Sequence, residues 1–120
     1  MFISISFSSA QTVGGKKDPV GKWKFEAPYA PEGYTSGSIS IGFSENKYSA
    51  IMELAGAGVK FAGENVKIKN DSISFYLNIE DESVIIKLKL ESSTKMTGRG
   101  VYSEGVIPIT LIRSEALTED

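Results

Sequence analysis

The feature that most constrains the fold is an alternation of apolar and polar residues with a period of two. This alternation recurs in almost every segment between residues 22 and 113, and no stretch has the spacing of an amphipathic helix. Successive side chains of a β-strand point to opposite faces, so each segment predicts a strand with one apolar face and one hydrated face. The chain is therefore expected to be all-β and antiparallel.

Eight strands are predicted, at residues 22–27, 37–43, 47–54, 64–69, 72–79, 84–91, 95–102 and 107–113. The connections "SEN", "ND" and "SST" are typical of tight turns. "PYAPEGYTS" and "AGAGVKFAG" predict long loops, and "EDES" and "SEGV" predict connections of intermediate length. Successive connections of an up-and-down meander lie at opposite ends, so the tight turns should share one end and the longer loops the other. Closing such a meander removes its exposed edges, which favours an eight-stranded antiparallel up-and-down β-barrel. A two-sheet sandwich is the alternative.

Composition excludes several classes of function. The chain has no His and no Cys, which removes the commonest general base, the commonest zinc ligands and the thiolate nucleophile. We therefore expect no enzyme, no metal and no cofactor, and we interpret the acidic "EDES" segment as a solvated hairpin tip. A net charge of −2, without a basic patch interleaved with aromatics, argues against a nucleic-acid partner. No apolar run is long enough for a transmembrane helix.

The first residues, "MFISISFSSAQ", are similar to the end of a secretory signal, with an apolar run and then small residues before Gln11. This interpretation predicts a secreted or periplasmic protein, although no positively charged segment precedes the apolar run. A short N-terminal strand, "FISISF", is the alternative. The expected organisation is a signal remnant or flexible tail at 1–17, the barrel at 18–115 and an acidic tail at 116–120.

Two residues stand out at the start and at the end of the predicted barrel sequence, one aromatic and one cationic. Trp23, the only Trp, lies on the first predicted strand, and Arg113 ends the last one. If the barrel closes, these strands are antiparallel neighbours, and the two residues meet at the tight-turn end. There the guanidinium would lie over the indole ring in a cation–π contact, and Gly21 would let the chain turn tightly into the barrel.

The combination of Gly21, Trp23 and Arg113 resembles the calycin pattern of lipocalins, fatty-acid-binding proteins and avidins, in which a Gly-x-Trp on the first strand packs against an Arg of the last. "GKWKF", "KMTGRGVY" and "VIPITLIR" also resemble small lipocalin-like domains of secreted bacterial proteins. The resemblance implies a ligand that enters at the end opposite the Gly-x-Trp. The chain lacks the several Trp residues of an avidin pocket and the helical lid of the fatty-acid-binding branch.

Candidate ligand contacts follow from the end at which the long loops should lie. Tyr29 and Tyr34 on the first long loop would cap an apolar mouth, or simply pack on the rim. Phe61, in the second long loop, would be a lid residue or a plug. Met52 and Phe75 belong to an inner face that is expected to be apolar throughout: Phe25, Ile39, Ile41, Phe43, Met52, Leu54, Phe75, Leu77, Ile86, Leu88 and Met96.

A small apolar ligand is therefore the first functional hypothesis, and a filled barrel that serves as a non-catalytic interaction module is the second. A cavity above about 300 Å³ would favour the first and a packed core the second. Gly98 and Gly100, on the inner face, either leave space for a ligand or accommodate large facing side chains.

Overall fold

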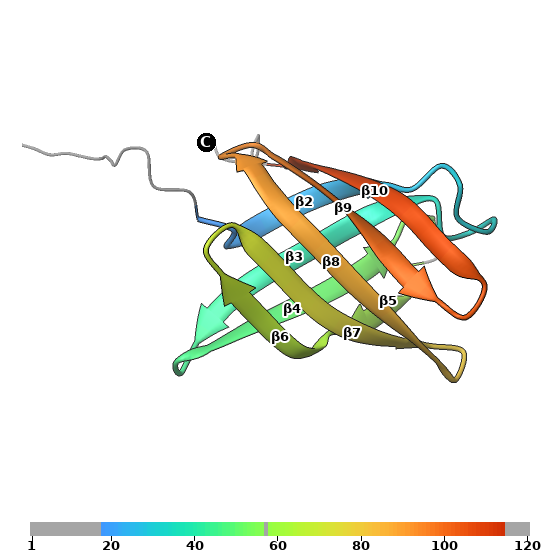
Figure 1. The fold of residues 1–120 in the computed structure, drawn as a ribbon, viewed down its shortest axis with the longest axis horizontal. Helices are drawn as coiled ribbons and strands as arrows, with labels where there is room; N and C mark the ends of the chain where they lie inside the picture. Colours follow the sequence, from blue (N-terminus) through green and yellow to red (C-terminus); the bar gives the residue numbers. More distant parts are fainter. Residues whose placement is uncertain (1–17, 57, 115–120) are drawn as a thin grey trace, which may run out of the picture.

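A computed structural model describes residues 18–56 and 58–114 of the protein. Nine antiparallel strands form one sheet: β2 (Gly21–Glu26), β3 (Ser36–Ser44), β4 (Lys47–Leu54), β5 (Lys60–Ala62), β6 (Glu64–Lys69), β7 (Ser72–Ile79), β8 (Glu82–Ser92), β9 (Lys95–Tyr102) and β10 (Gly105–Arg113). The sheet curves into a nearly closed up-and-down barrel (Figure 1). The predicted signal remnant and acidic tail lie outside the described residues, as does the alternative N-terminal strand. Within the described residues, no helix is long and apolar enough to cross a membrane.

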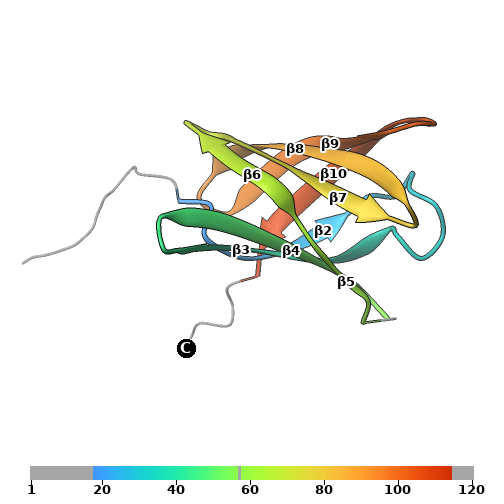
Figure 2. The same cartoon turned by 90° about the horizontal axis from the view of Figure 1, so that it is seen from below.

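The predicted count of eight strands is wrong by one, because the expected long loop before residue 64 contains β5. β5 pairs with β4, and β6, only one residue later, pairs with β7. The chain changes partners at Gly63, whose N–H donates to the carbonyl of Ala50 at 2.7 Å. β4 also contacts β6, and β5 contacts β7, so this bent segment brings the two ends of the sheet together (Figure 2).

Three tight turns lie at one end of the barrel, as predicted: Glu45–Asn46, Asn70–Asp71 and Ser93–Thr94. The prediction that the opposite end has only longer connections is wrong, because the β7–β8 and β9–β10 connections are also two-residue turns. Glu80 and Asp81 both have positive φ, the backbone that a type I′ hairpin turn requires. No Gly or Asn marks that turn in the sequence. The long loops at this end are the β2–β3 loop, 27–35, and the β4–β5 loop, 55–59.

The apolar faces of the strands point inward and form one core. Seventeen hydrophobic residues are buried, and the largest fully buried side chains are Trp23, Phe75, Ile39, Ile73, Leu77, Leu90, Met96 and Leu111. Phe43 was predicted to be an inner-face residue, and this is wrong, since it is 52% exposed. It lies beside the Glu45–Asn46 turn, where its ring centroid is 4.6 Å from that of Tyr48. Apolar residues at strand ends that extend past the core are exposed, although the alternating pattern predicts that they are buried.

The first and last strands of the predicted barrel are paired, and Trp23 and Arg113 are direct cross-strand partners. The guanidinium carbon lies 4.3 Å from the centroid of the indole ring, whose Nε1 donates to the carbonyl of Pro19 at 2.9 Å. Arg113 also donates to the carbonyls of Val20 (2.8 Å) and Ser93 (2.7 Å). Gly21 has a φ of +142°, and a Cβ there would clash with the guanidinium. The expected cation–π contact is therefore present, and Gly21 begins β2 with a positive φ that favours glycine.

We expect Trp23→Ala to lower the free energy of unfolding by about 3–5 kcal/mol, as for other buried large aromatics. Arg113→Ala should cost less, and the two effects should be coupled by roughly 0.5–2 kcal/mol because the residues share a cation–π contact. Urea unfolding of a double-mutant cycle measures the coupling. Ile112→Ala, at an exposed neighbouring position of the same strand, provides the control cycle and should show no coupling to Trp23. Equal coupling in both cycles would contradict a specific contact.

Candidate ligand-binding site

The end of the barrel that carries the two long loops opens into a cavity of about 270 Å³. Its walls come from the adjoining ends of β2, β4, β7, β8, β9 and β10, and residues of the β2–β3 loop cover part of its mouth. The lining is mainly apolar and aromatic: Phe25, Ala27, Ala30, Pro31, Tyr34, Met52, Leu77, Ile79, Val84, Ile86, Gly100, Tyr102, Ile107 and Ile109. Trp23, Met96 and Leu111, which are fully buried, do not line this cavity.

Two glycines of β9 have opposite roles in shaping this interior. A Cβ on Gly98 would clash with the backbone carbonyl of Lys87, so this glycine allows β8 and β9 to approach closely. A Cβ on Gly100 would meet Ile86, Ile109 and Val84 at 3.4–3.8 Å, which is ordinary van der Waals contact. Gly100 is buried and lines the cavity. Its missing side chain therefore leaves space for another molecule and is not required by the backbone.

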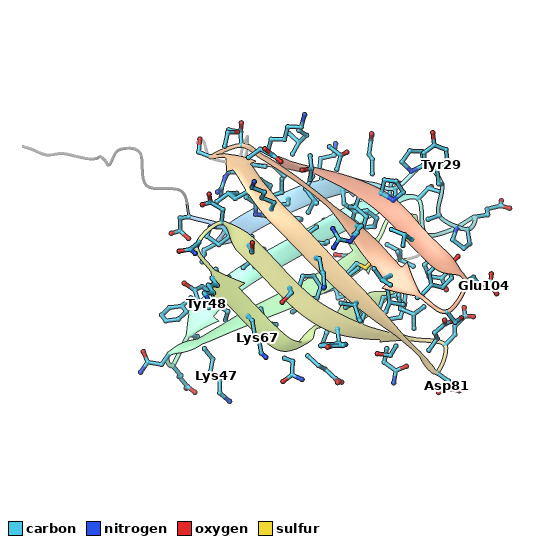
Figure 3. The ribbon with its side chains drawn as sticks, in the orientation of Figure 1. Tyr29, Lys47, Tyr48, Lys67, Asp81 and Glu104 are labelled. Atoms are coloured by element: carbon cyan, nitrogen blue, oxygen red, sulfur yellow. The ribbon has the colours of Figure 1, made fainter. Side chains whose placement is uncertain are left out.

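The structure brings two of the five predicted ligand contacts, Tyr34 and Met52, into the wall of the cavity. Tyr29 is 78% exposed and points away from the barrel (Figure 3). Phe61, on β5, packs against the core as the cross-strand partner of Met52, and Phe75 is fully buried on β7. Neither phenylalanine lines the cavity.

The polar groups at the mouth are two carboxylates that the sequence analysis did not identify as site residues. Glu80 and Glu82 come from the β7–β8 hairpin and line the cavity. Glu80 Oε2 accepts a hydrogen bond of 2.7 Å from the Tyr34 hydroxyl, and Glu82 Oε2 accepts one of 2.8 Å from the Ser103 N–H. The tip of the β7–β8 hairpin is thereby hydrogen-bonded to both the β2–β3 loop and the β9–β10 turn. The alternation of strand direction places this tip at the long-loop end, but the sequence analysis interpreted its acidic residues only as a solvated hairpin tip.

These hydrogen bonds change the ionisation of two residues. The hydrogen bond to Glu80 raises the pKa of Tyr34, and partial burial and the negative charge of Glu80 act in the same direction. Hydrogen bonds from the side chain and the backbone N–H of Ser103 lower the pKa of Glu82. Glu82 is therefore ionised at neutral pH, and the Tyr34 hydroxyl keeps its proton and donates. The described residues include no group of acidic side chains that could hold a metal ion.

No protein-family profile matches this chain, and no curated protein matches it. It is similar in structure to a solved protein titled "Structure of a redesigned beta barrel", with a TM-score of 0.56 and 18% sequence identity over 80% of this chain and 91% of the other. At that identity the likeness supports the barrel fold alone.

We predict that Tyr34 titrates above the usual tyrosine pKa of about 10. Because its pKa is raised by folding, the Tyr34–Glu80 contact contributes stability below about pH 10 and loses it as pH rises through the folded-state value. Ultraviolet titration of the native protein, minus that of Tyr34→Phe, isolates this residue. In Glu80→Ala the same difference should shift to lower pH. A Tyr34 curve unaffected by Glu80→Ala would show that the hydrogen bond does not form in solution.

Proposed function

We propose that the protein is a non-catalytic barrel that binds a small apolar molecule in the cavity at the long-loop end. The observation that carries this proposal is an open space of about 270 Å³ whose wall is formed mainly by apolar side chains on the ends of six strands. Apolar pockets with a few polar groups at one side are typical ligand sites. A cavity that opens to solvent through its own loops offers the ligand a route of entry.

The size of the cavity restricts the ligand. Its 270 Å³ falls just short of the range of about 300–1,000 Å³ that is usual for drug-sized ligands. A buried apolar cavity of about 150 Å³ holds one benzene molecule, so the space here suits a body of about ten non-hydrogen atoms. A long fatty acid or a retinoid-sized molecule would not fit without rearrangement of the loops.

The second candidate, an interaction module with a filled core, is favoured by the other half of the barrel. Around Trp23 the interior is packed, and Leu90, Met96 and Leu111 are almost completely inaccessible to solvent. A ligand is therefore confined to the half nearer the long loops. If nothing binds there, a role in protein interaction is the better account of the barrel.

We further propose a relationship to the calycins and a secreted or periplasmic location. The contact of Trp23 with Arg113 and the close approach of Gly21 to the same guanidinium support the first, together with a cavity opening at the opposite end. The second rests on the apolar N-terminal segment of the sequence.

Substitution of Gly100 tests the proposed ligand function directly. Gly100→Leu should fill the cavity and weaken the binding of a neutral naphthalene fluorophore by at least about tenfold, a loss of about 1.4 kcal/mol. Gly100→Ala, which adds only a methyl group at ordinary contact distance, should still bind. Fluorescence titration measures both, and thermal unfolding verifies that each variant is folded.

The wild-type protein decides between the two candidates. A folded wild type that binds no apolar fluorophore, within its solubility, would favour the interaction module. Equal binding by wild type and Gly100→Leu would place the probe elsewhere and overturn the cavity as the site.

A further inference from the structure

Charged residues are distributed unequally between the two ends of the barrel. At the mouth, the connections and the residues that flank them carry Glu26, Glu32, Glu80, Asp81, Glu82 and Glu104. A positive charge also lies at this end: Lys60, at the start of β5, is the cross-strand partner of the acidic Glu53 on β4. At the opposite end, the five cations Lys22, Lys47, Lys69, Lys95 and Arg113 outnumber the four acidic residues Asp18, Glu45, Asp71 and Glu91. Figure 3 shows Asp81 and Glu104 at the mouth and Lys47 at the far end.

Two of the mouth carboxylates belong to the cavity itself. Glu80 is directed toward the β2–β3 loop by its bond with Tyr34, and Glu82 toward the β9–β10 turn by its bond with Ser103. Glu80 accepts from the Tyr34 hydroxyl and Glu82 from the side chain and N–H of Ser103, and a carboxylate has about four acceptor sites, so both groups can accept further hydrogen bonds. Among the described residues that line the cavity, none carries a positive charge.

Aromatic rings accompany these carboxylates. Tyr34, from the β2–β3 loop, and Tyr102, at the end of β9, both line the cavity. A tyrosine ring attracts a cation near its face, and several such rings beside acidic groups are a known way to recognise ammonium ligands. The cavity therefore combines an apolar interior with a mouth of carboxylates and tyrosine rings.

We propose that the cavity selects a small cationic amphiphile, a protonated aliphatic amine or an ammonium compound, whose head lies between Glu80 and Glu82 and whose apolar body fills the barrel. This inference rests on the proposed ligand function. The acidic mouth would also draw such a molecule in from solution, since a surface of one sign raises the local concentration of the opposite charge. A carboxylate of the same chain length would face two carboxylates without a compensating cation, which disfavours its binding.

The test compares three ligands that share a chain and differ in their head: octan-1-amine, octan-1-ol and octanoate. Calorimetric titration at pH 7 and low salt should give the highest affinity for the amine and the lowest for octanoate, with at least about a tenfold difference between these two. Added salt should weaken the binding of the amine and leave the binding of the alcohol nearly unchanged, because salt screens charge at an exposed mouth.

Variants locate the head group. Glu80→Gln with Glu82→Gln keeps acceptor oxygens for Tyr34 and Ser103 but removes both charges, so the affinity for the amine should fall to that for the alcohol. Glu104→Gln removes one charge from the same end at an exposed position that does not line the cavity, and should have a much smaller effect. Thermal unfolding establishes that both proteins fold.

The outcomes separate the two proposals. If the alcohol binds and octanoate binds as tightly as the amine, the cationic preference is wrong and the apolar-ligand function stands. If Glu104→Gln weakens the binding of the amine as much as the double variant does, the specific role proposed for Glu80 and Glu82 is contradicted. If none of the three ligands binds, the proposed ligand function fails, and this inference fails with it.

Discussion

The barrel depends on the pairing of its first and last long strands, β2 and β10, which lie far apart in the sequence. Every other ladder joins strands that follow one another in the chain, so β2–β10 is the one that turns a meander into a barrel. Arg113 lies at the end of this ladder. Its guanidinium stacks on Trp23, caps carbonyls of the segment that enters β2, and reaches the β8–β9 turn at Ser93. One side chain thus joins three segments at the ladder that closes the barrel. It lies at the end where the core is packed.

The interior is divided into a packed half around Trp23 and a hollow half at the mouth. β9 illustrates it: Met96 is fully buried near the Trp23 end, whereas Gly100, four residues later on the same face, leaves space beside Ile86 and Ile109. The packed core around Trp23 and the cavity therefore lie in different halves of the barrel. Changes at the mouth should leave the packed half intact, while changes near Trp23 should affect the fold as a whole.

Period-two alternation predicted the strands well, because burial of one face of a strand requires apolar residues at every second position. The Trp23–Arg113 contact followed from the alternation of strand direction. β5 was missed because three residues are too few to show a period and lie among Gly and Ala. The connection at Glu80–Asp81 was predicted to be a hairpin tip but too long, because its positive φ values are adopted without Gly or Asn. The site was only partly predicted: Tyr34 and Met52 line the cavity, but Phe61 and Phe75 pack into the wall and core. Which inward residue faces a cavity depends on packing across the barrel, and a strand-by-strand pattern does not contain that information.

The change of partner at Gly63 interrupts the hydrogen-bonded wall of the barrel. β5 pairs with the mouth end of β4, and β6 pairs with β7, but no ladder joins β6 to the remaining half of β4 in the described chain. Unpaired backbone on two neighbouring strands would normally invite a strand from another molecule. Here the two edges face each other in contact, and Lys47, Lys67 and Lys69 lie along them. β4 and β6 therefore meet through packing and not through a hydrogen-bonded ladder, and lysines beside such edges discourage edge-to-edge association with another molecule.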